Sequence, residues 1–494
     1  MSTSLKVLTI ILSERLNTFA ETNNLFSVSQ AGFRRSEECV TQAACMIDTL
    51  QRRKLKDMST FVTFIDFKKA YDMVPHGALF AKLKSLGIRG RCLEFLQGLY
   101  SSSTVQVRLG IGPQAILSDT CKLLRGLRQG CPLSPVLFNF FINDIFDDRE
   151  GDYGLSGVVV PYGKKGEDPQ DFRIKGTLFA DDCATLSESV EDVVACCAHV
   201  AHWAHDNEMQ VGIKKCGILE VRPDGAEPEL SEDHPLREFL QIHGDLVPIV
   251  DSYVYLGLNI SSDITIPALA ECRVNIGKAR VAKILPFLVT PVLPLAMRLR
   301  VVQTVVLPSL LFGAEIYGMN RELTDKMQRL ANRCYRAIIG LSGRSFTPVP
   351  SIPLWRECCQ KPLCAIAASY RARAYVKGRS LKTQLRLLVK KPLVTRKWTW
   401  STGVIKWFKI FCLKHARDLD MDNIASPESE GFTPSQTMVC VRNAIVHRET
   451  QIRLNLVRET AAATAQYLYQ NSFEKRSLFK AKVGSHSFQV TQLR

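Results

Sequence analysis

The sequence has no CxxC pair, although it contains 16 cysteines. Structural zinc sites usually take ligands from such closely spaced pairs, so the sequence gives no indication of a zinc knuckle. The cysteines are scattered, and a chain of 494 residues is far longer than the small secreted domains that depend on disulfide bonds. We therefore expect reduced, mostly buried thiols and an intracellular protein.

Long apolar runs are also missing. No stretch of about 20 apolar residues is free of charge, which excludes a predicted membrane-spanning helix. The apolar run from Leu5 to Leu12 leads into Arg15 without a small-residue cleavage site, so no signal peptide is predicted. The sequence shows neither an internal repeat nor a low-complexity tract, which argues against solenoid and fibrous proteins.

Acidic residues are few relative to basic ones. The 64 Lys and Arg against 48 Asp and Glu give a net charge of +16 and a pI near 9.2. This excess predicts a polyanionic partner, with nucleic acid first and an anionic membrane surface second. Hydrophobic residues at 46% and charged residues at 23% are ordinary for a globular protein, so the chain should fold. Its length corresponds to about three domains.

Helical and strand patterns alternate up to about residue 262, and helical patterns dominate from about 264 onward. Residues 37–56 have apolar positions at helical spacing, and residues 58–67 are dense in β-branched and aromatic side chains. Residues 172–189 contain two apolar runs on either side of an Asp-Asp pair, which predicts a hairpin with the acids at its tip.

Carboxylates follow two of the predicted strands. Asp66 comes near the end of the run FVTFIDF, and Asp181 and Asp182 follow the run TLFA. Ionised carboxylates gathered at strand ends repel one another, and a hard divalent cation offsets this repulsion. Two Mg²⁺ ions about 4 Å apart can activate a 3′-hydroxyl and stabilise a leaving pyrophosphate, which indicates nucleotidyl or phosphoryl transfer. Each acid taken alone is explained equally well as a turn residue.

A glycine-rich turn lies between the two acidic segments. The sequence RGLRQGCPLSPVLFNFFIND (residues 125–144) joins basic residues to an apolar helix that begins with proline. Glycine lets a backbone approach a nucleotide closely, and Gln129 can hydrogen-bond a sugar or a phosphate. A plain turn before a buried helix accounts for the apolar helix but leaves the RGLRQG sequence unexplained.

The order of these segments resembles the reverse transcriptase of non-LTR (LINE-type) retrotransposons. The motifs that carry the resemblance are SQAGFRRSEEC (29–39), FIDFKKAYDMVPH (64–76), RGLRQGCPLSPVLFNFFIND (125–144), FADD (179–182), a lysine-bearing strand around IKKC (213–216) and YVYLG (253–257). The resemblance covers roughly residues 5–345, and the remaining residues are recognisable only as basic and helical.

The resemblance implies a role for each matching residue. Asp66 and Asp181 match the principal ligands of both metal ions, and Asp182 matches the adjacent acid of the same motif. Phe67 matches the position whose backbone carbonyl joins the second metal. Tyr71 falls at the steric gate, where a bulky ring clashes with a 2′-hydroxyl and favours deoxynucleotides. RNA-dependent RNA polymerases usually carry an acid at that place.

Five further positions match less specific parts of the family pattern. Gln129 and Gly130 match the turn that positions the nucleotide. Lys215 is the best match to the lysine that protonates the pyrophosphate, but a solvated lysine beside Lys214 explains the sequence equally well. Arg34 and the arginine after it match contacts to the triphosphate, with a surface role as the rival explanation.

The predicted fold is α+β, a right-hand polymerase with fingers, a palm containing an antiparallel sheet, and a helical thumb, followed by a basic, mostly helical C-terminal extension. We expect partial fingers in 1–60, the palm with the remaining fingers in 61–261, the thumb in 262–345 and the basic helical region in 346–494. Because the first fingers motif begins only near residue 5 and no endonuclease pattern is found, the chain is expected to be an N-terminally truncated fragment of a larger polyprotein.

The resemblance implies an RNA-directed DNA polymerase that uses two Mg²⁺ ions, for which Mn²⁺ can substitute. The implied partners are an RNA template, a DNA primer or target and deoxynucleoside triphosphates, with no membrane, and the implied location is the nucleus. One alternative is a catalytically inactive nucleic-acid-binding relic. Another is an RNA-dependent RNA polymerase or an intron-type reverse transcriptase, the first of which Tyr71 argues against.

Positive charge is most concentrated in residues 371–400, which contain ten Lys or Arg and no acid, together with Tyr375, Trp398 and Trp400. Basic side chains neutralise phosphates and aromatic rings stack on bases, so this segment predicts a grip on single-stranded nucleic acid. The alternative is a solvated face whose tryptophans pack inward.

Overall fold

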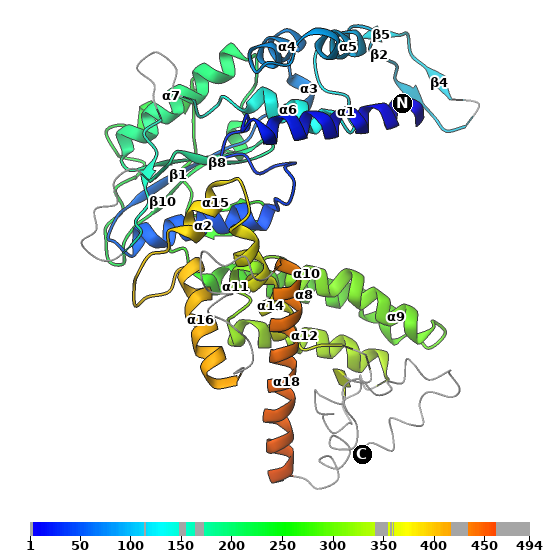
Figure 1. Ribbon diagram of the computed structural model, residues 1–494, viewed down its shortest axis with the longest axis vertical. Coiled ribbons are helices and arrows are strands. Elements are labelled where there is room, and N and C mark those ends of the chain that lie inside the picture. Colours follow the sequence, from blue (N-terminus) through cyan, green and yellow to red (C-terminus); the bar gives the residue numbers. More distant parts are fainter. Residues whose placement is uncertain are drawn as a thin grey trace. The chain divides into compact units, whose positions relative to one another are not determined.

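The computed structural model describes residues 3–112, 115–147, 155–163, 172–340, 354–355, 358, 360–415 and 433–460. The chain divides into two compact units, whose elements are labelled in Figure 1. Unit 1 comprises Met1–Asp263 and Leu381–Val394, and unit 2 comprises Ile264–Ser380 and Thr395–Arg494. The sequence did not predict that residues 381–394 would belong to unit 1.

A four-stranded antiparallel sheet forms the centre of unit 1, with the strand order β10-β1-β9-β8. Its strands are β1 (Thr60–Ile65), β8 (Gly176–Phe179), β9 (Asp182–Ser187) and β10 (Gly217–Val221). All six residues of β1 are buried, because helices cover both faces of the sheet. The predicted hairpin is confirmed, since β8 and β9 pair with Phe179 opposite Asp182.

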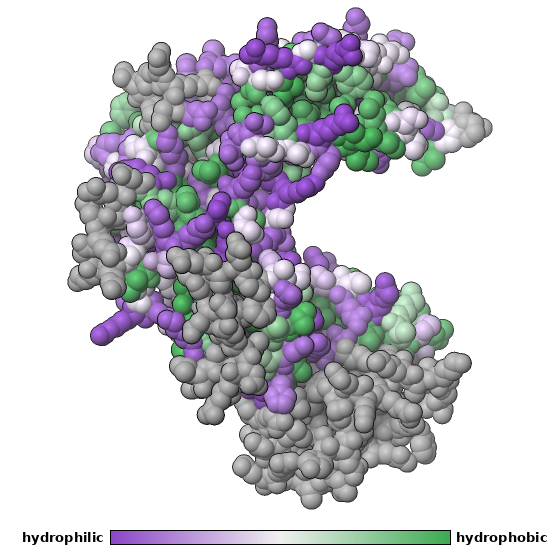
Figure 2. Space-filling view, viewed as in Figure 1, coloured by the Kyte–Doolittle hydropathy of each residue, from purple (hydrophilic) through white to green (hydrophobic). Residues whose placement is uncertain are grey.

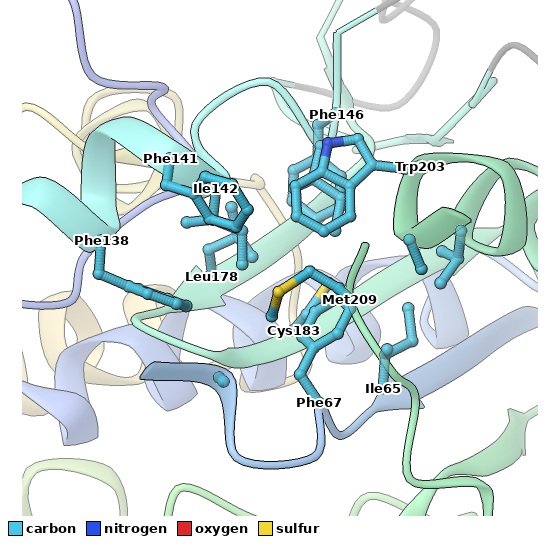
Figure 3. Packing of buried hydrophobic residues seen from close by; sticks show 14 of the residues in the cluster. Ile65, Phe67, Phe138, Phe141, Ile142, Phe146, Leu178, Cys183, Trp203 and Met209 are labelled. Atoms are coloured by element: carbon cyan, nitrogen blue, oxygen red, sulfur yellow. The ribbon is translucent and has the colours of Figure 1, made fainter. Parts of the chain in front are cut away.

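The helices of unit 1 are α1 (Thr3–Thr22), α2 (Cys39–Lys54), α3 (Ala70–Met73), α4 (His76–Ser85), α5 (Gly90–Ser101), α6 (Ser134–Ile142), α7 (Val190–Asp206) and α15 (Gln384–Lys390), with the 3₁₀ turns η1 (Ile213–Lys215) and η2 (Arg237–Phe239). Figures 1 and 3 show α6 and α7 over one face of the sheet and α2 along the other. Proline in the first turn of α6 pre-sets the backbone for its start, and the helix is buried along almost its whole length.

The main core of unit 1 lies between the sheet and the helices α6 and α7. Figure 3 shows Phe138 and Phe141 of α6 and Trp203 of α7 above Leu178 and Cys183 of the hairpin, all of them buried. The Phe141 and Trp203 rings lie 5.9 Å apart in an edge-on arrangement, which favours their quadrupoles. This aromatic core therefore packs against the hairpin that carries the acids.

Short two-stranded ribbons complete unit 1. They are β2–β5 (Thr104–Val105 with Cys121–Lys122), β3–β4 (Arg108–Leu109 with Ile116–Leu117), β6–β7 (Val158–Val159 with Arg173–Ile174), β11–β12 (Gln241–Ile242 with Asp245–Leu246) and β13–β14 (Ser252–Tyr255 with Leu258–Ser261). The ribbon that contains β3 and β4 exposes Leu109, Ile111 and Ile116. Figure 2 shows hydrophobic side chains gathered at this end of unit 1.

All the regular secondary structure that the structure describes in unit 2 is helical. Its helices are α8 (Ile266–Val289), α9 (Leu295–Val301), the π-helical turn η3 (Val302–Val306), α10 (Leu307–Leu311), α11 (Ala314–Tyr317), α12 (Arg321–Ile338), α14 (Leu363–Gly378), α16 (Trp400–His415) and α18 (Pro434–Thr460). Val281, Leu310, Tyr317 and Met327 lie in its core. Among the described helices of the whole chain, none is long and apolar enough to cross a membrane.

The basic segment 371–400, for which the sequence predicts a grip on nucleic acid, is divided between the two units. Its middle part, residues 381–394, folds with unit 1, whereas the flanking parts belong to unit 2. Within unit 2, Arg371 and Trp400 are buried, and Arg371 Nη2 donates to the Trp400 carbonyl at 3.0 Å. Trp398 is 52% exposed, so of these two rings it alone is available to stack on a base.

Candidate active site

Antiparallel pairing of β1 with β9 brings the predicted acids together. The register pairs Ile65 with Cys183. Because the strands run in opposite directions, Asp66 just after the first of these residues lies beside Asp182 just before the second. Asp181 occupies the turn between β8 and β9. The three carboxylates therefore lie at the same end of the sheet.

The surroundings of these acids oppose their ionisation. Burial first, and then the charge of Asp66, raises the pKa of Asp181. Burial first, followed by the charges of Asp181 and Asp66, raises the pKa of Asp182 to about 6. Lys215 acts in the opposite direction on both. Carboxylates in this state gain most from a divalent cation, which cancels their repulsion and replaces lost hydration.

The donor set is that of a hard divalent cation. Asp66, Asp181 and Asp182 supply carboxylate oxygens, the ligands that Mg²⁺ accepts best. Within the described ranges, no three His, Cys, Asp or Glu side chains already stand at the spacing of a closed metal cluster. A metal at this end of the sheet would therefore draw its remaining ligands from water, substrate or backbone, which is how Mg²⁺ is usually held in proteins.

Phe67 contributes its backbone to this region and its ring to the core. The ring lies 5.7 Å from that of Trp203 and is buried. The two hydrogen bonds that pair this segment with residues 210–212 lie on either side of Phe67, so its carbonyl takes no part in that pairing. The position is thus compatible with the backbone ligand that the sequence resemblance implies.

Lys215 is the cation beside Asp66. Its Nζ lies 3.4 Å from the carboxylate of Asp66, and its side chain is 75% exposed. The sequence predicted a strand here, but the residue lies in the 3₁₀ turn η1 before β10. Tyr253 Oη donates to the Lys215 carbonyl at 2.7 Å and holds this turn in place.

Gly212 lies against Asp66 at the start of this turn. A Cβ on Gly212 would lie 2.7 Å from Oδ2 of Asp66, and the Gly212 N–H donates to the Asp66 carbonyl at 2.7 Å. A larger residue at this position would therefore require the Asp66 carboxylate to shift. The sequence analysis did not single out Gly212, and the available signal was a glycine three residues before the lysine that reaches the acid.

Tyr71 stands on an aromatic support next to the acids. Its ring stacks on Phe138 with centroids 4.6 Å apart and planes 13° apart. The half-exposed ring of Phe33 meets it edge-on at 6.4 Å. Burial first, and then the charge of Asp181, raises the pKa of the Tyr71 hydroxyl. The Tyr71 side chain is therefore packed between aromatic rings and uncharged, and it lies close to the three carboxylates.

The glycine-rich turn packs directly on the segment that carries Tyr71. The Leu127 N–H donates to the Tyr71 carbonyl at 2.7 Å, and the Gly126 N–H donates to the Val74 carbonyl at 2.8 Å. Gly126 has a φ of 90°, and a Cβ there would lie 2.7 Å from the Asp72 carbonyl oxygen. This close backbone contact accounts for the first glycine of the RGLRQG sequence.

Gln129 and Gly130 lie at the exposed end of the same turn. Gln129 Nε2 donates to Asp72 Oδ1 at 2.9 Å, which fixes the turn beside the residue that follows Tyr71. Gly130 has a φ of 76°, and no atom lies within 4 Å of the Cβ that it lacks. The turn thus presents open backbone near the segment that carries Tyr71.

The side chain of Arg34 forms hydrogen bonds and an ion pair within unit 1. Its guanidinium forms a two-bond ion pair with Glu21, with Nε–Oε1 at 2.8 Å and Nη2–Oε2 at 3.0 Å. Its Nη1 donates to the carbonyls of Ser27 and Gln30, each at 3.0 Å, and the side chain is buried. These contacts favour a structural role over the direct triphosphate contact that the sequence resemblance implies.

Gln30 and Gly32 join the SQAG segment to the acid-bearing hairpin, and the sequence analysis missed both. Gln30 Oε1 accepts from the Ala180 N–H at 3.0 Å and from the Gly32 N–H at 2.7 Å. A Cβ on Gly32 would lie 2.1 Å from the Ala180 nitrogen, so no larger residue fits without a backbone shift. Their position within the SQAG motif was the only available signal.

Residues 1–260 match the protein family described as "Reverse transcriptase (RNA-dependent DNA polymerase)". The chain is 27% identical over 250 residues to a Pol polyprotein from the type-1 retrotransposable element R2 of Popillia japonica, covering 50% of this chain and 32% of that protein. It is 22% identical over 349 residues to the RNA-directed DNA polymerase from mobile element jockey of Drosophila melanogaster, covering 68% of this chain and 34% of that protein. The chain spans less than half the length of these relatives, whose names agree with the resemblance seen in the motifs.

Among solved structures, the telomerase from Candida albicans in complex with a fragment of telomeric RNA aligns with 85% of this chain and 56% of that chain. The TM-score is 0.34 and the sequence identity is 11%, values too low to support an argument about fold.

Proposed function

This chain belongs to the reverse transcriptase (RNA-dependent DNA polymerase) family, and we propose that unit 1 carries out RNA-directed DNA synthesis by nucleotidyl transfer onto a primer 3′-hydroxyl. The observation that carries the proposal is the convergence of Asp66, Asp181 and Asp182 at one end of the sheet, where repulsion and burial raise the pKa of the hairpin acids. An acid group of this kind has no packing function at the end of apolar strands.

Asp66 and Asp181 would hold both of two Mg²⁺ ions, with Asp182 and the Phe67 carbonyl as further ligands. Bound there, the ions supply activation of the primer hydroxyl and stabilisation of the leaving pyrophosphate. The Lys215 ammonium, 3.4 Å from the Asp66 carboxylate, is near enough to this centre to give a proton to the pyrophosphate.

Tyr71 is proposed to select the sugar, because its ring, which stacks on Phe138, would clash with a 2′-hydroxyl placed against it. Gln129 and Gly130 would position the nucleotide through the exposed backbone of their turn. The ion pair between buried Arg34 and partly exposed Glu21 would support nucleotide binding indirectly, by holding the SQAG segment in shape.

We further propose that the chain is the polymerase part of a non-LTR retrotransposon, in line with the R2 and jockey relatives. Unit 1 would supply the fingers and palm of a right-hand polymerase, and the helices of unit 2 the thumb and the basic extension. The expected substrates are an RNA template, a DNA primer or target end and deoxynucleoside triphosphates, and the expected location is the nucleus.

The test is primer extension by the full chain on an RNA template of mixed sequence with an annealed DNA primer, Mg²⁺ and four deoxynucleotides. The expected product is DNA complementary to the RNA, read by sequencing, and omission of one deoxynucleotide should stop synthesis before the first position that needs it. Failure to extend the primer, on a template that a retroviral reverse transcriptase copies in parallel, would contradict the proposal.

A further inference from the structure

Residues 381–394 lie outside the part of the chain that matches the reverse transcriptase family, yet they fold with unit 1. Both ends of the segment continue into unit 2 along the chain. The segment contains α15 and packs along α2 and next to β8, the strand that leads to the acid-bearing turn. Hydrogen bonds from buried side chains hold the segment, so it is an integral part of unit 1.

The C-terminal end of α15 is held by Arg52 of α2. The Arg52 side chain is fully buried, and its Nη2 and Nη1 donate to the carbonyls of Leu388 and Lys391, each at 2.7 Å. Asp48 Oδ2 accepts from Arg52 Nε at 2.8 Å and balances its charge. The last carbonyls of a helix have no partner within the helix and carry its negative dipole end, so a guanidinium is well suited to this position.

The N-terminal end of α15 is held by Gln384, whose side chain is buried. Gln384 Nε2 donates to Ser29 Oγ at 2.8 Å and to the Gly176 carbonyl at 3.1 Å. Its backbone N–H donates to the Val28 carbonyl at 3.1 Å. The Gln384 carboxamide therefore donates to Ser29, which belongs to the segment 28–32, and to Gly176 of β8, the strand beside that segment.

The hydrogen bonds between residues 28–32 and the hairpin continue to the acids. The Leu178 N–H donates to the Ser29 carbonyl at 2.8 Å, and the Ala31 N–H donates to the Leu178 carbonyl at 2.9 Å. Two residues further on, Gln30 Oε1 accepts from the Ala180 N–H, and Asp181 follows in the chain. Gln384 thus lies at one end of a continuous series of hydrogen bonds, and the other end of this series is the turn that bears Asp181.

We propose that Gln384 is a positioning residue, which fixes the hairpin carrying Asp181 and Asp182 by tying Ser29 to β8. The proposal rests on the proposed function for its effect on catalysis, but not for its effect on the hairpin. It assigns a role in the polymerase site to a residue more than a hundred positions beyond the matched family region. Carboxylate ligands that lose such outer support bind their metal less well.

The test compares Gln384→Met, which keeps the side-chain length and removes both donated bonds, with Leu387→Met, an exposed position on the same helix. Hydrogen exchange followed by mass spectrometry on residues 176–187 should show faster exchange in Gln384→Met and wild-type exchange in Leu387→Met. This arm needs no catalytic activity. Wild-type exchange across the hairpin in a folded Gln384→Met protein would overturn the proposal.

A second arm uses the full chain in primer extension over a range of Mg²⁺ concentrations. We expect Gln384→Met to raise the Mg²⁺ concentration for half-maximal incorporation by about tenfold, because outer-shell changes typically weaken metal sites by that factor or more. Leu388→Ala removes a buried leucine of α15 without touching Ser29 or Gly176. It should lower the melting temperature and leave the Mg²⁺ dependence unchanged. An equal Mg²⁺ shift in both variants would overturn the proposal, since Gln384 would then be merely structural.

Ser29→Ala provides the same test from the other side of the bond, and it keeps the proposal falsifiable if Gln384→Met does not fold. It should produce a smaller change in hairpin exchange than loss of both bonds, because the bond from Gln384 to Gly176 remains. An unchanged hairpin in Ser29→Ala would overturn the proposal. Absence of incorporation by the wild-type chain would contradict the proposed function alone, and the exchange measurement would still decide the role of Gln384.

Discussion

The ammonium group of Lys215 lies 3.4 Å from the carboxylate of Asp66, whereas Lys214, one residue earlier, is exposed and has no such neighbour among the described acids. If Lys215 gives a proton to the pyrophosphate, Lys215→Ala should lower kcat by about a hundredfold or more. Lys214→Ala is the matched control and should retain nearly full kcat. Single-turnover incorporation measures both, and equal losses in the two variants would refute the assignment.

Tyr71→Ala should admit ribonucleotides. The ring that stacks on Phe138 would be gone, and relief of only 1.4 kcal/mol of steric exclusion changes a rate ratio by about tenfold. Tyr71→Phe is the control, because it keeps the ring and should keep the preference for deoxynucleotides. The measurement is the ratio of kcat/KM for a deoxynucleotide and its ribonucleotide. An unchanged ratio in Tyr71→Ala would show that the gate lies elsewhere.

Gly212→Ala should impair incorporation without preventing folding. The new Cβ would stand 2.7 Å from Oδ2 of Asp66 and force that carboxylate to move. A displacement of a metal ligand by a fraction of an ångström is enough to weaken a preorganised site. Gly98→Ala, at an exposed helical position with nothing within 4 Å of its Cβ, is the control and should be neutral or slightly stabilising. Incorporation by Gly212→Ala at the wild-type rate would contradict the contact.

The raised pKa of Asp182 predicts how stability changes with pH. Its pKa is about 6 in the folded chain against an ordinary value of 3.8, so the folded state holds a proton between these values that the unfolded state has lost. Without metal, the free energy of unfolding should therefore decrease as pH rises from about 4 to about 6, and it should stay lower above that range. Asp182→Asn should remove this part of the pH dependence, as measured by thermal melting.

Divalent metal should restore the folding stability that the chain loses as the pH rises above about 6. Mg²⁺ binds the ionised carboxylates and only the folded chain brings them together, so it should raise the melting temperature at about pH 7.5 and have little effect at about pH 5. A Mg²⁺-induced shift of the same size at both pH values would mean that the ion binds elsewhere.

The carboxylate hairpin could be predicted from the sequence because every signal for it is local. Apolar runs on both sides of Asp181 and Asp182, with a tight turn between them, leave little choice of structure, and the structure has this hairpin. The 3₁₀ turn at Lys215 could not be predicted, because its contacts with Asp66 and Tyr253 join residues that are distant in the sequence. A local pattern of apolar residues there was consistent with a simple strand.

The contribution of residues 381–394 to unit 1 could not be predicted from the sequence either. Arg52 and Gln384 are polar residues that ordinary patterning places at the surface, and both are buried by partners far along the chain. The bond from Arg52 to Leu388 spans 336 positions, and the bond from Gln384 to Gly176 spans 208. Periodicity and propensity contain no information on pairs at that separation, so charge counting alone suggested a nucleic-acid surface.

The central claim is that the acids at the end of the sheet catalyse RNA-templated DNA synthesis. Its most direct test is incorporation of dTMP on poly(rA) primed with oligo(dT) in Mg²⁺, with wild-type protein, Asp181→Asn and the control Asp119→Asn, which alters an exposed acid between β4 and β5. The account predicts full activity in wild type and Asp119→Asn, and loss of incorporation in Asp181→Asn with RNA affinity retained, because binding depends on basic side chains. Incorporation by Asp181→Asn at the wild-type rate would contradict the metal assignment, and RNA binding without incorporation by wild type would identify the chain as an inactive nucleic-acid-binding relic.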